Sequence, residues 1–120
     1  MKMSESREMY LETILILSRT HPQLHAIDVC EYMDFSRPSV SRALKQLKEA
    51  GLINVDVFNH VTLTPQGEKI ALTVYERHTV LTKALVFLGV EKDVAQQDAC
   101  RIEHVISPES FEAIKRKMEE

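Results

Sequence analysis

Three residues near the C-terminal end of the chain carry side chains that can bind one metal ion together. Cys100, Glu103 and His104 are separated by three and four positions along residues 100–104. In a helix this spacing places a thiol, a carboxylate and an imidazole on one face. Mixed sulfur, oxygen and nitrogen ligands suit borderline divalent metals such as Fe, Mn, Co, Ni and Zn. The segment therefore predicts a transition-metal site.

The other ligands of such an ion must come from elsewhere in the chain. Met9 and Glu12 lie three positions apart near the N-terminus, and His78 lies in a long apolar-patterned segment. Each residue also has a plainer interpretation, because Met9 fits an apolar stripe and Cys100 alone would be a small buried residue. The cluster, rather than any one member, carries the metal hypothesis.

Six segments have the apolar periodicity of helices. They cover roughly residues 4–18, 26–33, 37–50, 65–88, 92–105 and 108–120. In the first helix we expect an inward stripe with Tyr10 at its edge. The stripe consists of Met9, Leu11, Ile14, Leu15 and Leu17. In the second helix we expect four buried or half-buried residues, namely Ile27, Cys30, Tyr32 and Met33.

In the middle of the chain, individual residues indicate where a helix begins and ends and where strands follow. Ser36 is suited to cap a helix, and Pro38 fits the first turn of that helix. Gly51 can adopt the left-handed conformation that ends it. Residues 52–57 and 60–64 then alternate as strands do, which predicts a small hairpin.

The order helix, turn, helix, hairpin is that of a winged helix-turn-helix. Its second helix enters the major groove of DNA by its N-terminal residues. The predicted DNA-binding residues are Ser36, Arg37, Pro38, Ser39, Ser41, Arg42 and Lys45. Arg42 can pair with guanine, whereas Arg37, Lys45 and the hairpin near Asn59 can meet phosphates. The alternative is a solvated helix face that contacts other proteins.

The charge, the lengths of the apolar runs and the number of cysteines limit the classes of protein to which the chain can belong. Net charge is −3 over 120 residues, yet residues 36–49 hold four basic side chains and one acidic one. A local basic face can bind phosphate within an acidic protein. No run of about 18 apolar residues predicts a membrane span, and the polar N-terminus shows no secretory signal. Two cysteines favour a reducing cytoplasm. We expect no membrane partner and no small organic ligand.

Several stretches together resemble the diphtheria toxin repressor and manganese transport regulator family of bacterial metal-dependent repressors. These stretches are residues 8–14, 36–41, 63–67, 77–78 and 99–104. The resemblance implies a mainly α fold, with a winged helix-turn-helix DNA-binding domain over 1–72. It also implies a helical dimerisation and metal-binding domain over 73–120, without the SH3-like domain of the iron branch. We therefore expect a homodimer that binds a palindromic double-stranded DNA operator.

The resemblance also implies a ligand set. The iron branch has a primary site that resembles Met9, Cys100, Glu103 and His104, whereas the manganese branch has carboxylates at the positions of Met9 and Cys100. Sulfur ligands favour Fe(II), although Glu12 matches the manganese branch, so Mn(II) remains possible. The iron branch builds a second site around the position of His78. Two of its ligands are replaced here by Thr82 and Gln96, so His78 is left to join Glu12, Glu103 or a water.

Two other functions compete with a metal-activated repressor. A winged-helix regulator can sense oxidation through Cys100, because a thiolate beside His104 is reactive. A metal-dependent enzyme needs an open coordination position and a substrate cleft. Nothing in the sequence indicates either feature, so we expect no enzymatic activity.

Overall fold

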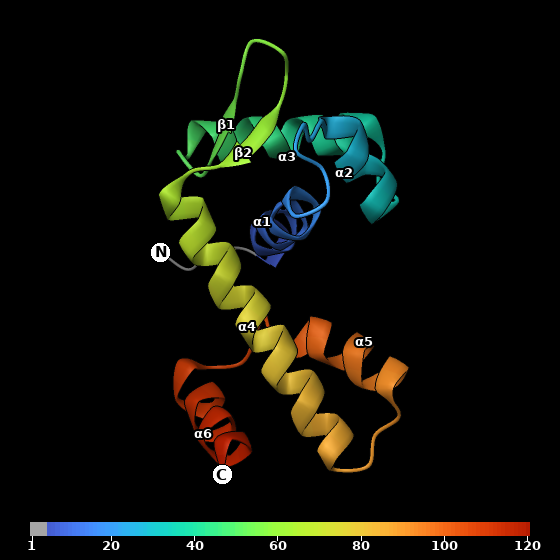
Figure 1. The fold of residues 1–120 in the computed structure, drawn as a ribbon, viewed down its shortest axis with the longest axis vertical. Coiled ribbons are helices and arrows are strands. Elements are labelled where there is room, and N and C mark those ends of the chain that lie inside the picture. The colour runs from blue at the N-terminus through green and yellow to red at the C-terminus, as the bar shows by residue number, and fades with distance from the viewer. Residues whose placement is uncertain (1–4) are drawn as a thin grey trace. The chain divides into compact units, whose positions relative to one another are not determined.

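The computed structural model describes residues 5–120, which divide into two compact units, up to Leu72 and from Thr73 onward (Figure 1). The elements are α1 Glu5–Ser18, α2 Ala26–Met33, α3 Arg37–Glu49, β1 Ile53–Val55, β2 Val61–Leu63, α4 Pro65–Phe87, α5 Lys92–Ile102 and α6 Pro108–Glu119. The predicted start of the first helix, Ser4, lies outside the described residues. The protein is mainly helical, as predicted.

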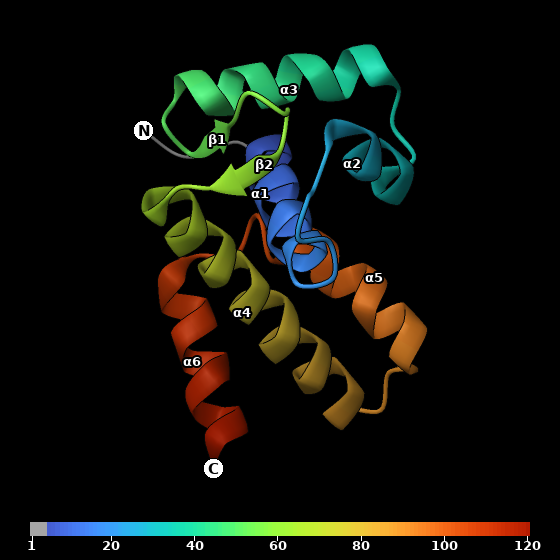
Figure 2. The ribbon, with the colours of Figure 1, turned by 45° about the horizontal axis from the view of Figure 1, so that its top comes forward.

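The first unit packs α1, α2, α3 and the hairpin around one core (Figure 2). The stripe on α1 is buried except at Met9, which is half-buried. The prediction that Tyr10 lies at the edge is wrong, since the residue is 4% exposed and its ring packs edge-on against Phe35. On α2 the prediction is also partly wrong, because Val29 is buried while Ile27 and Tyr32 are exposed.

Helix α3 begins and ends as its sequence predicts. The Ser36 hydroxyl accepts a hydrogen bond from the Ser39 amide at 3.3 Å, and Pro38 lies in the first turn. Gly51 has a φ of +76°, the left-handed conformation that ends the helix. The buried face, which anchors α3 to the core, consists of Val40, Leu44 and Leu47.

The hairpin pairs β1 with β2 antiparallel, with Asn54 opposite Thr62. Both strands are shorter than predicted. Its base is joined to α4 through Thr64, whose amide donates to the Leu52 carbonyl and whose hydroxyl donates to the Gly51 carbonyl at 2.8 Å. Gly67 in the first turn of α4 lies so close to the Leu52 backbone that any Cβ would collide with it. The start of α4 is therefore fixed to the hairpin.

The second unit contains the rest of α4 together with α5 and α6. Its core is formed by Leu81, Ala99 and Phe111, with Val80, Ile102, Ile106 and Ile114 packed around them. Caps begin both later helices, because Glu91 accepts from the Val94 amide and Ser107 accepts from the Ser110 amide. Helix α5 ends at Ile102, three residues before the predicted boundary. Among the described residues, no helix is both long and apolar enough to cross a membrane.

Candidate metal centre and nucleic-acid interface

Glu103 is a charged side chain in the interior of the protein. It follows the last residue of α5, and its amide still donates to the Ala99 carbonyl at 2.9 Å. Its carboxylate is 0% exposed, and Oε1 accepts no hydrogen bond. Burial of a carboxylate costs several kcal/mol unless cations or donors surround it. Such an oxygen is suited to bind a cation.

His104 directs a second ligand atom to the same place. Its Nε2 lies 3.3 Å from Oε1 of Glu103, and its side chain is buried. Two ligand atoms that each lie about 2.1 Å from one ion, at an angle of roughly 90–110°, are about 3.0–3.4 Å apart. The spacing of this carboxylate and imidazole therefore fits two neighbouring ligands of one divalent metal.

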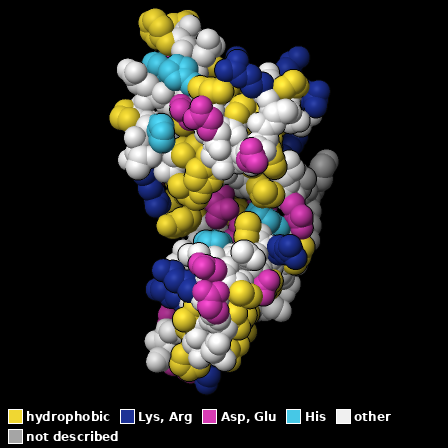
Figure 3. All heavy atoms as spheres, turned by 90° about the vertical axis from the view of Figure 1, so that its right-hand side faces the viewer, with side chains coloured by type: hydrophobic (Ala, Val, Ile, Leu, Met, Phe, Trp, Pro, Cys, Tyr) yellow, Lys and Arg dark blue, Asp and Glu magenta, His cyan; other side chains and the backbone are white. Residues whose placement is uncertain are grey.

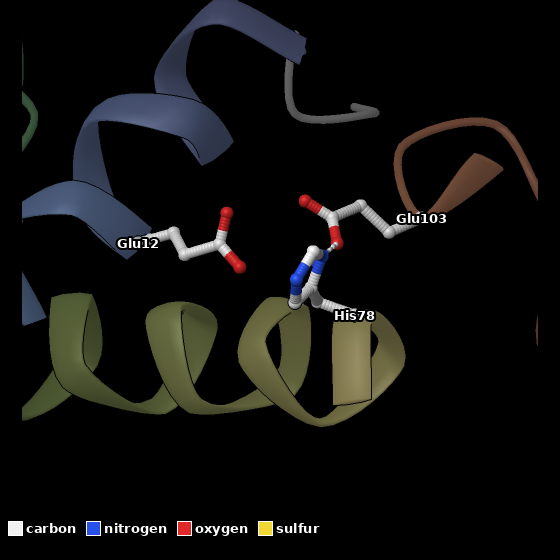
Figure 4. Close-up of side chains that lie close together, drawn as sticks. All are labelled: Glu12, His78 and Glu103. Carbon is white, nitrogen blue, oxygen red and sulfur yellow. Dashed lines mark hydrogen bonds and ion pairs between the residues drawn. The ribbon is translucent and has the colours of Figure 1, made fainter. Parts of the chain in front are cut away.

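His78 lies on the other side of the Glu103 carboxylate. From α4, its Nδ1 is 3.0 Å from Oε2 of Glu103 (Figure 4). Each oxygen of Glu103 is thus adjacent to a histidine, which gives an N–O–O–N set of donor atoms. Nitrogen and oxygen ligands of this kind suit Mn, Fe, Co and Zn. The structure therefore brings together three of the six predicted metal ligands.

Arg77 fixes the turn that carries this cluster, a role that the sequence analysis did not assign. Its guanidinium donates to the backbone carbonyls of Glu103 at 3.2 Å and Ile106 at 3.5 Å. It also lies over the Phe111 ring, 5.7 Å from the centroid. No local sequence signal reveals this contact, because the partners are 26 and 29 positions away along the chain.

Cys100 is exposed, and the simpler interpretation of it as a buried residue is wrong. It borders a surface hollow together with His78. The other residues that border the hollow are Asp93, Gln96, Gln97 and Arg101. Gln96 therefore lies on the side of α5 that faces the hollow beside His78. Met9 and Glu12, the two remaining predicted ligands, lie three residues apart on α1 of the first unit.

The surface of α3 is divided into two faces. Pro38, Arg42 and Glu49 recur at helical spacing opposite the buried face, so they point outward. A second face borders a groove of about 630 Å³ between α2, α3 and the hairpin. Its polar lining residues are His25, Arg37, Ser41, Lys45, Lys48 and Asn59.

This groove is cationic, and Arg42 is absent from its lining. Arg37, Lys45 and Lys48 are suited to a phosphate backbone, whereas Arg42 on the outward face is suited to a base edge. The predicted DNA-binding residues Ser36 and Ser39 also contact each other at the start of α3. There the Ser36 hydroxyl donates a hydrogen bond to Ser39 Oγ at 2.9 Å. Pro38 and Ser41 are exposed.

Two family models together cover nearly the whole chain. Residues 2–61 match the N-terminal DNA binding domain of iron dependent repressors. Residues 64–120 match the iron dependent repressor metal binding and dimerisation domain. The chain belongs to the iron-dependent repressor family. The members of this family are metal-dependent, DNA-binding transcriptional repressors, so the resemblance found in the sequence is confirmed.

Two curated relatives illustrate the similarity to this family. The chain is 35% identical over 106 residues to the transcriptional regulator MntR of Escherichia coli O157:H7, covering 88% of this chain and 68% of MntR. It is 32% identical over 104 residues to the iron-dependent repressor IdeR of Mycobacterium tuberculosis H37Rv, covering 86% of this chain and 45% of IdeR.

A solved structure supports the same fold. A manganese-dependent transcriptional repressor in complex with manganese matches with a TM-score of 0.85 and 27% identity, over 92% of this chain. The chain spans about half the length of that structure, 51%. The winged helix-turn-helix followed by a helical domain is therefore confirmed as the fold class.

Proposed function

We propose that this protein is a cytoplasmic transcriptional repressor that binds palindromic operators of metal-homeostasis genes when it carries Fe(II) or Mn(II). The observation that carries the proposal is the buried Glu103 carboxylate between the imidazoles of His78 and His104. A divalent ion would offset the negative charge of the buried carboxylate, and the cationic groove beside α3 would supply the affinity for DNA.

Two parts of the chain supply the proposed ligands. Glu103, His104 and Cys100 belong to the second unit, whereas Met9 and Glu12 belong to α1, directly before the helix-turn-helix. An ion that is shared by both groups would favour one placement of α1 relative to the second unit. Such coupling between sites is typically about 1–3 kcal/mol, enough for a 5- to 150-fold change in DNA affinity.

We propose Fe(II) as the preferred ion because Met9 and Cys100 offer sulfur, which late divalent metals bind more readily than Mn(II) does. Glu12, Glu103 and two histidines would also accept Mn(II). His78 and Glu12 are the residues available for a second ion beside the first. Glu103 would then bind one ion through each of its oxygens.

The second unit also exposes apolar side chains that support a homodimer. Phe87 and Leu88, at the end of α4, are 79% and 75% exposed. Val86 and Val94, on either side of this turn in the sequence, are also exposed. Twofold pairing through the end of α4 and the start of α5 would match a palindrome, because one helix-turn-helix reads only one half-site. Sedimentation that shows a monomer at micromolar concentration with metal present would contradict a dimer.

The proposed function is tested by metal-dependent DNA binding. Glu103→Ala and His104→Ala should each remove the response of DNA affinity to Fe(II) or Mn(II) while the far-ultraviolet circular dichroism stays helical. Lys115→Ala, which changes a half-buried lysine of the same unit that offers no metal ligand, serves as the control and should retain the response. If both cluster variants keep the full metal response, the cluster is not the activating site.

A further inference from the structure

Two histidines meet between the hairpin and the start of α2. The rings of His25 and His60 have centroids 4.8 Å apart and cross at an interplanar angle of 75°. His25 directly precedes α2, and His60 directly precedes β2. Both residues are half-buried, so solvent still reaches them. At the end of the protein where the hairpin lies, Figure 3 shows histidine side chains on the surface, beside acidic and basic ones.

Backbone hydrogen bonds hold the two histidines together. The Val61 amide donates to the Leu24 carbonyl at 2.8 Å, and each of these two residues is the sequence neighbour of one of the histidines. The His25 amide donates to Oδ2 of Asp28 at 2.9 Å, which ties His25 to the first turn of α2. The fold itself therefore places the two imidazoles side by side.

Asp56 orients the ring of His60. Its Oδ2 lies 3.2 Å from Nδ1 of His60, while its Oδ1 accepts hydrogen bonds from the amides of Phe58 and His60. A neutral imidazole that donates its Nδ1 hydrogen to a carboxylate carries a lone pair on Nε2. Histidines that bind metal ions are commonly held in this way, because the carboxylate fixes the tautomer and the orientation of the ring. Nε2 of His60 is thus suited to be a ligand atom.

The separation of the two rings fits two ligands of one ion. Two imidazoles that bind an ion at about 2.1 Å, at an angle of roughly 90–110°, have ring centres about 4.6–5.3 Å apart. The observed separation of 4.8 Å lies within this range. The carboxylates of Asp28 and Asp56 already accept hydrogen bonds from backbone amides, so water would complete the coordination.

We propose that His25 and His60 form a separate surface site that binds a late divalent ion such as Zn(II) or Ni(II) and joins the hairpin to α2. Imidazole nitrogen binds these ions more tightly than it binds Mn(II) or Fe(II). Both ligands belong to the first unit, whereas Glu103 and His104 belong to the second. The site therefore goes beyond the proposed function, and either of the two can fail alone.

Binding at this site should oppose the local opening of the hairpin. Each strand is only three residues long, and so short a hairpin is marginally stable by itself. An ion held by one residue of the hairpin and one residue before α2 would favour the closed form, because it binds that form in preference to the open one. Hydrogen exchange of the hairpin amides measures this opening.

The experiment adds Zn(II) alone to the full chain. Equilibrium dialysis counts the ions bound per chain, and hydrogen exchange follows the hairpin amides with and without Zn(II). His25→Gln and His60→Gln should each bind one ion fewer than the unmodified protein and should lose the Zn(II)-dependent slowing of exchange. Glu103→Ala should keep that slowing, because it lacks only the centre of the second unit.

His21→Gln is the matched control, because Nδ1 of His21 contacts the Thr20 hydroxyl and the Leu17 carbonyl instead of another histidine. It should bind as many ions as the unmodified protein. An unchanged count in both His25→Gln and His60→Gln, or the loss of an ion in His21→Gln as well, would overturn the inference. So would hairpin amides of the unmodified protein that exchange equally fast with and without Zn(II), a result that depends on no variant.

Discussion

The Arg77 guanidinium donates a hydrogen bond to the backbone carbonyl of Glu103 at 3.2 Å. The residue that precedes His78 on α4 thereby holds the turn from which Glu103 and His104 project. Its stacking on Phe111 adds α6 to the same arrangement. Ligand geometry in the second unit therefore depends on a residue that offers no ligand atom itself.

Replacement of Arg77 by methionine should weaken metal binding by about 10- to 100-fold, the range found when groups that orient metal ligands are lost. Isothermal titration with Mn(II) measures the change. Lys115→Met is the matched control, because its partly exposed ion pair with Glu76 also joins α6 to α4 and contributes little to stability. Equal metal affinity in both variants would show that Arg77 does not position the ligands.

Glu103→Gln should stabilise the metal-free protein and abolish stabilisation by metal. The buried carboxylate opposes folding when no cation is present, and a neutral amide of the same shape relieves that cost. In the unmodified protein, metal should raise the melting temperature, because an ion that binds the native state in preference to the unfolded chain stabilises it. Thermal melts with and without Mn(II) check both effects. A metal-free Glu103→Gln protein that melts at a lower temperature would contradict this account of the cluster.

Arg42 and Lys45 should contribute to DNA binding in different ways. Arg42→Ala should cost roughly 1–3 kcal/mol and relax specificity at one base pair in each half-site. Lys45→Ala should weaken binding to all sequences alike and reduce the salt slope by about one per half-site. Binding to a library of operator variants at several salt concentrations separates the two. The assignment of Arg42 fails if its removal leaves the base preferences intact.

The preference among metals should follow the sulfur ligands. Changing Met9 to Asp and Cys100 to Glu replaces two soft donors with hard ones, so the double variant should respond to Mn(II) at lower concentration. It should also lose any advantage with Fe(II). Titrations must be anaerobic, because Cys100 is exposed and its oxidation would mimic loss of binding. The same order of metals in both proteins would show that sulfur does not select the ion.

Acid should loosen the hairpin tip at a pH below the ordinary range for aspartate. The amides of His60 and Phe58 lower the pKa of Asp56, with His60 contributing most. A carboxylate with a lowered folded pKa contributes its full stabilisation above the unfolded pKa, about 3.9, and loses it as the pH falls through the folded pKa. Amide chemical shifts of Phe58 and His60 should titrate together below that pH. A midpoint at or above 3.9 would contradict the assignment.

Local signals predicted the helices and most of their ends, but not all of their buried faces. Ser36, Gly51 and Ser107 act within a few residues of themselves, so the boundaries near them agree with the structure. Helix α5 ends early, where the Glu103 carbonyl accepts from the distant Arg77. The strands are short because Asp56 binds the amides of the tip. Contacts that span long distances in sequence leave no local pattern.

In the candidate metal site too, contacts between neighbouring residues were predictable from the sequence, whereas contacts between distant residues were not. Spacing alone indicated that Glu103 and His104 share one side of the chain, and the structure places their ligand atoms 3.3 Å apart. His78 was a candidate by residue type, and only the family resemblance suggested Glu103 as one of its partners, because their contact joins residues 25 positions apart. Tyr10 was misjudged for a similar reason, since its burial depends on packing against Phe35.

The close approach of Gly67 to Leu52 fixes the first turn of α4 against the backbone at the base of the hairpin. The 23 residues of α4 form a helix about 35 Å long, and its first turn contacts the base of the hairpin. A tilt of only about 5° would move the far end of a rod of that length by about 3 Å. A change in the direction of the first turn of α4 would therefore be largest around Phe87, at the other end of the same helix.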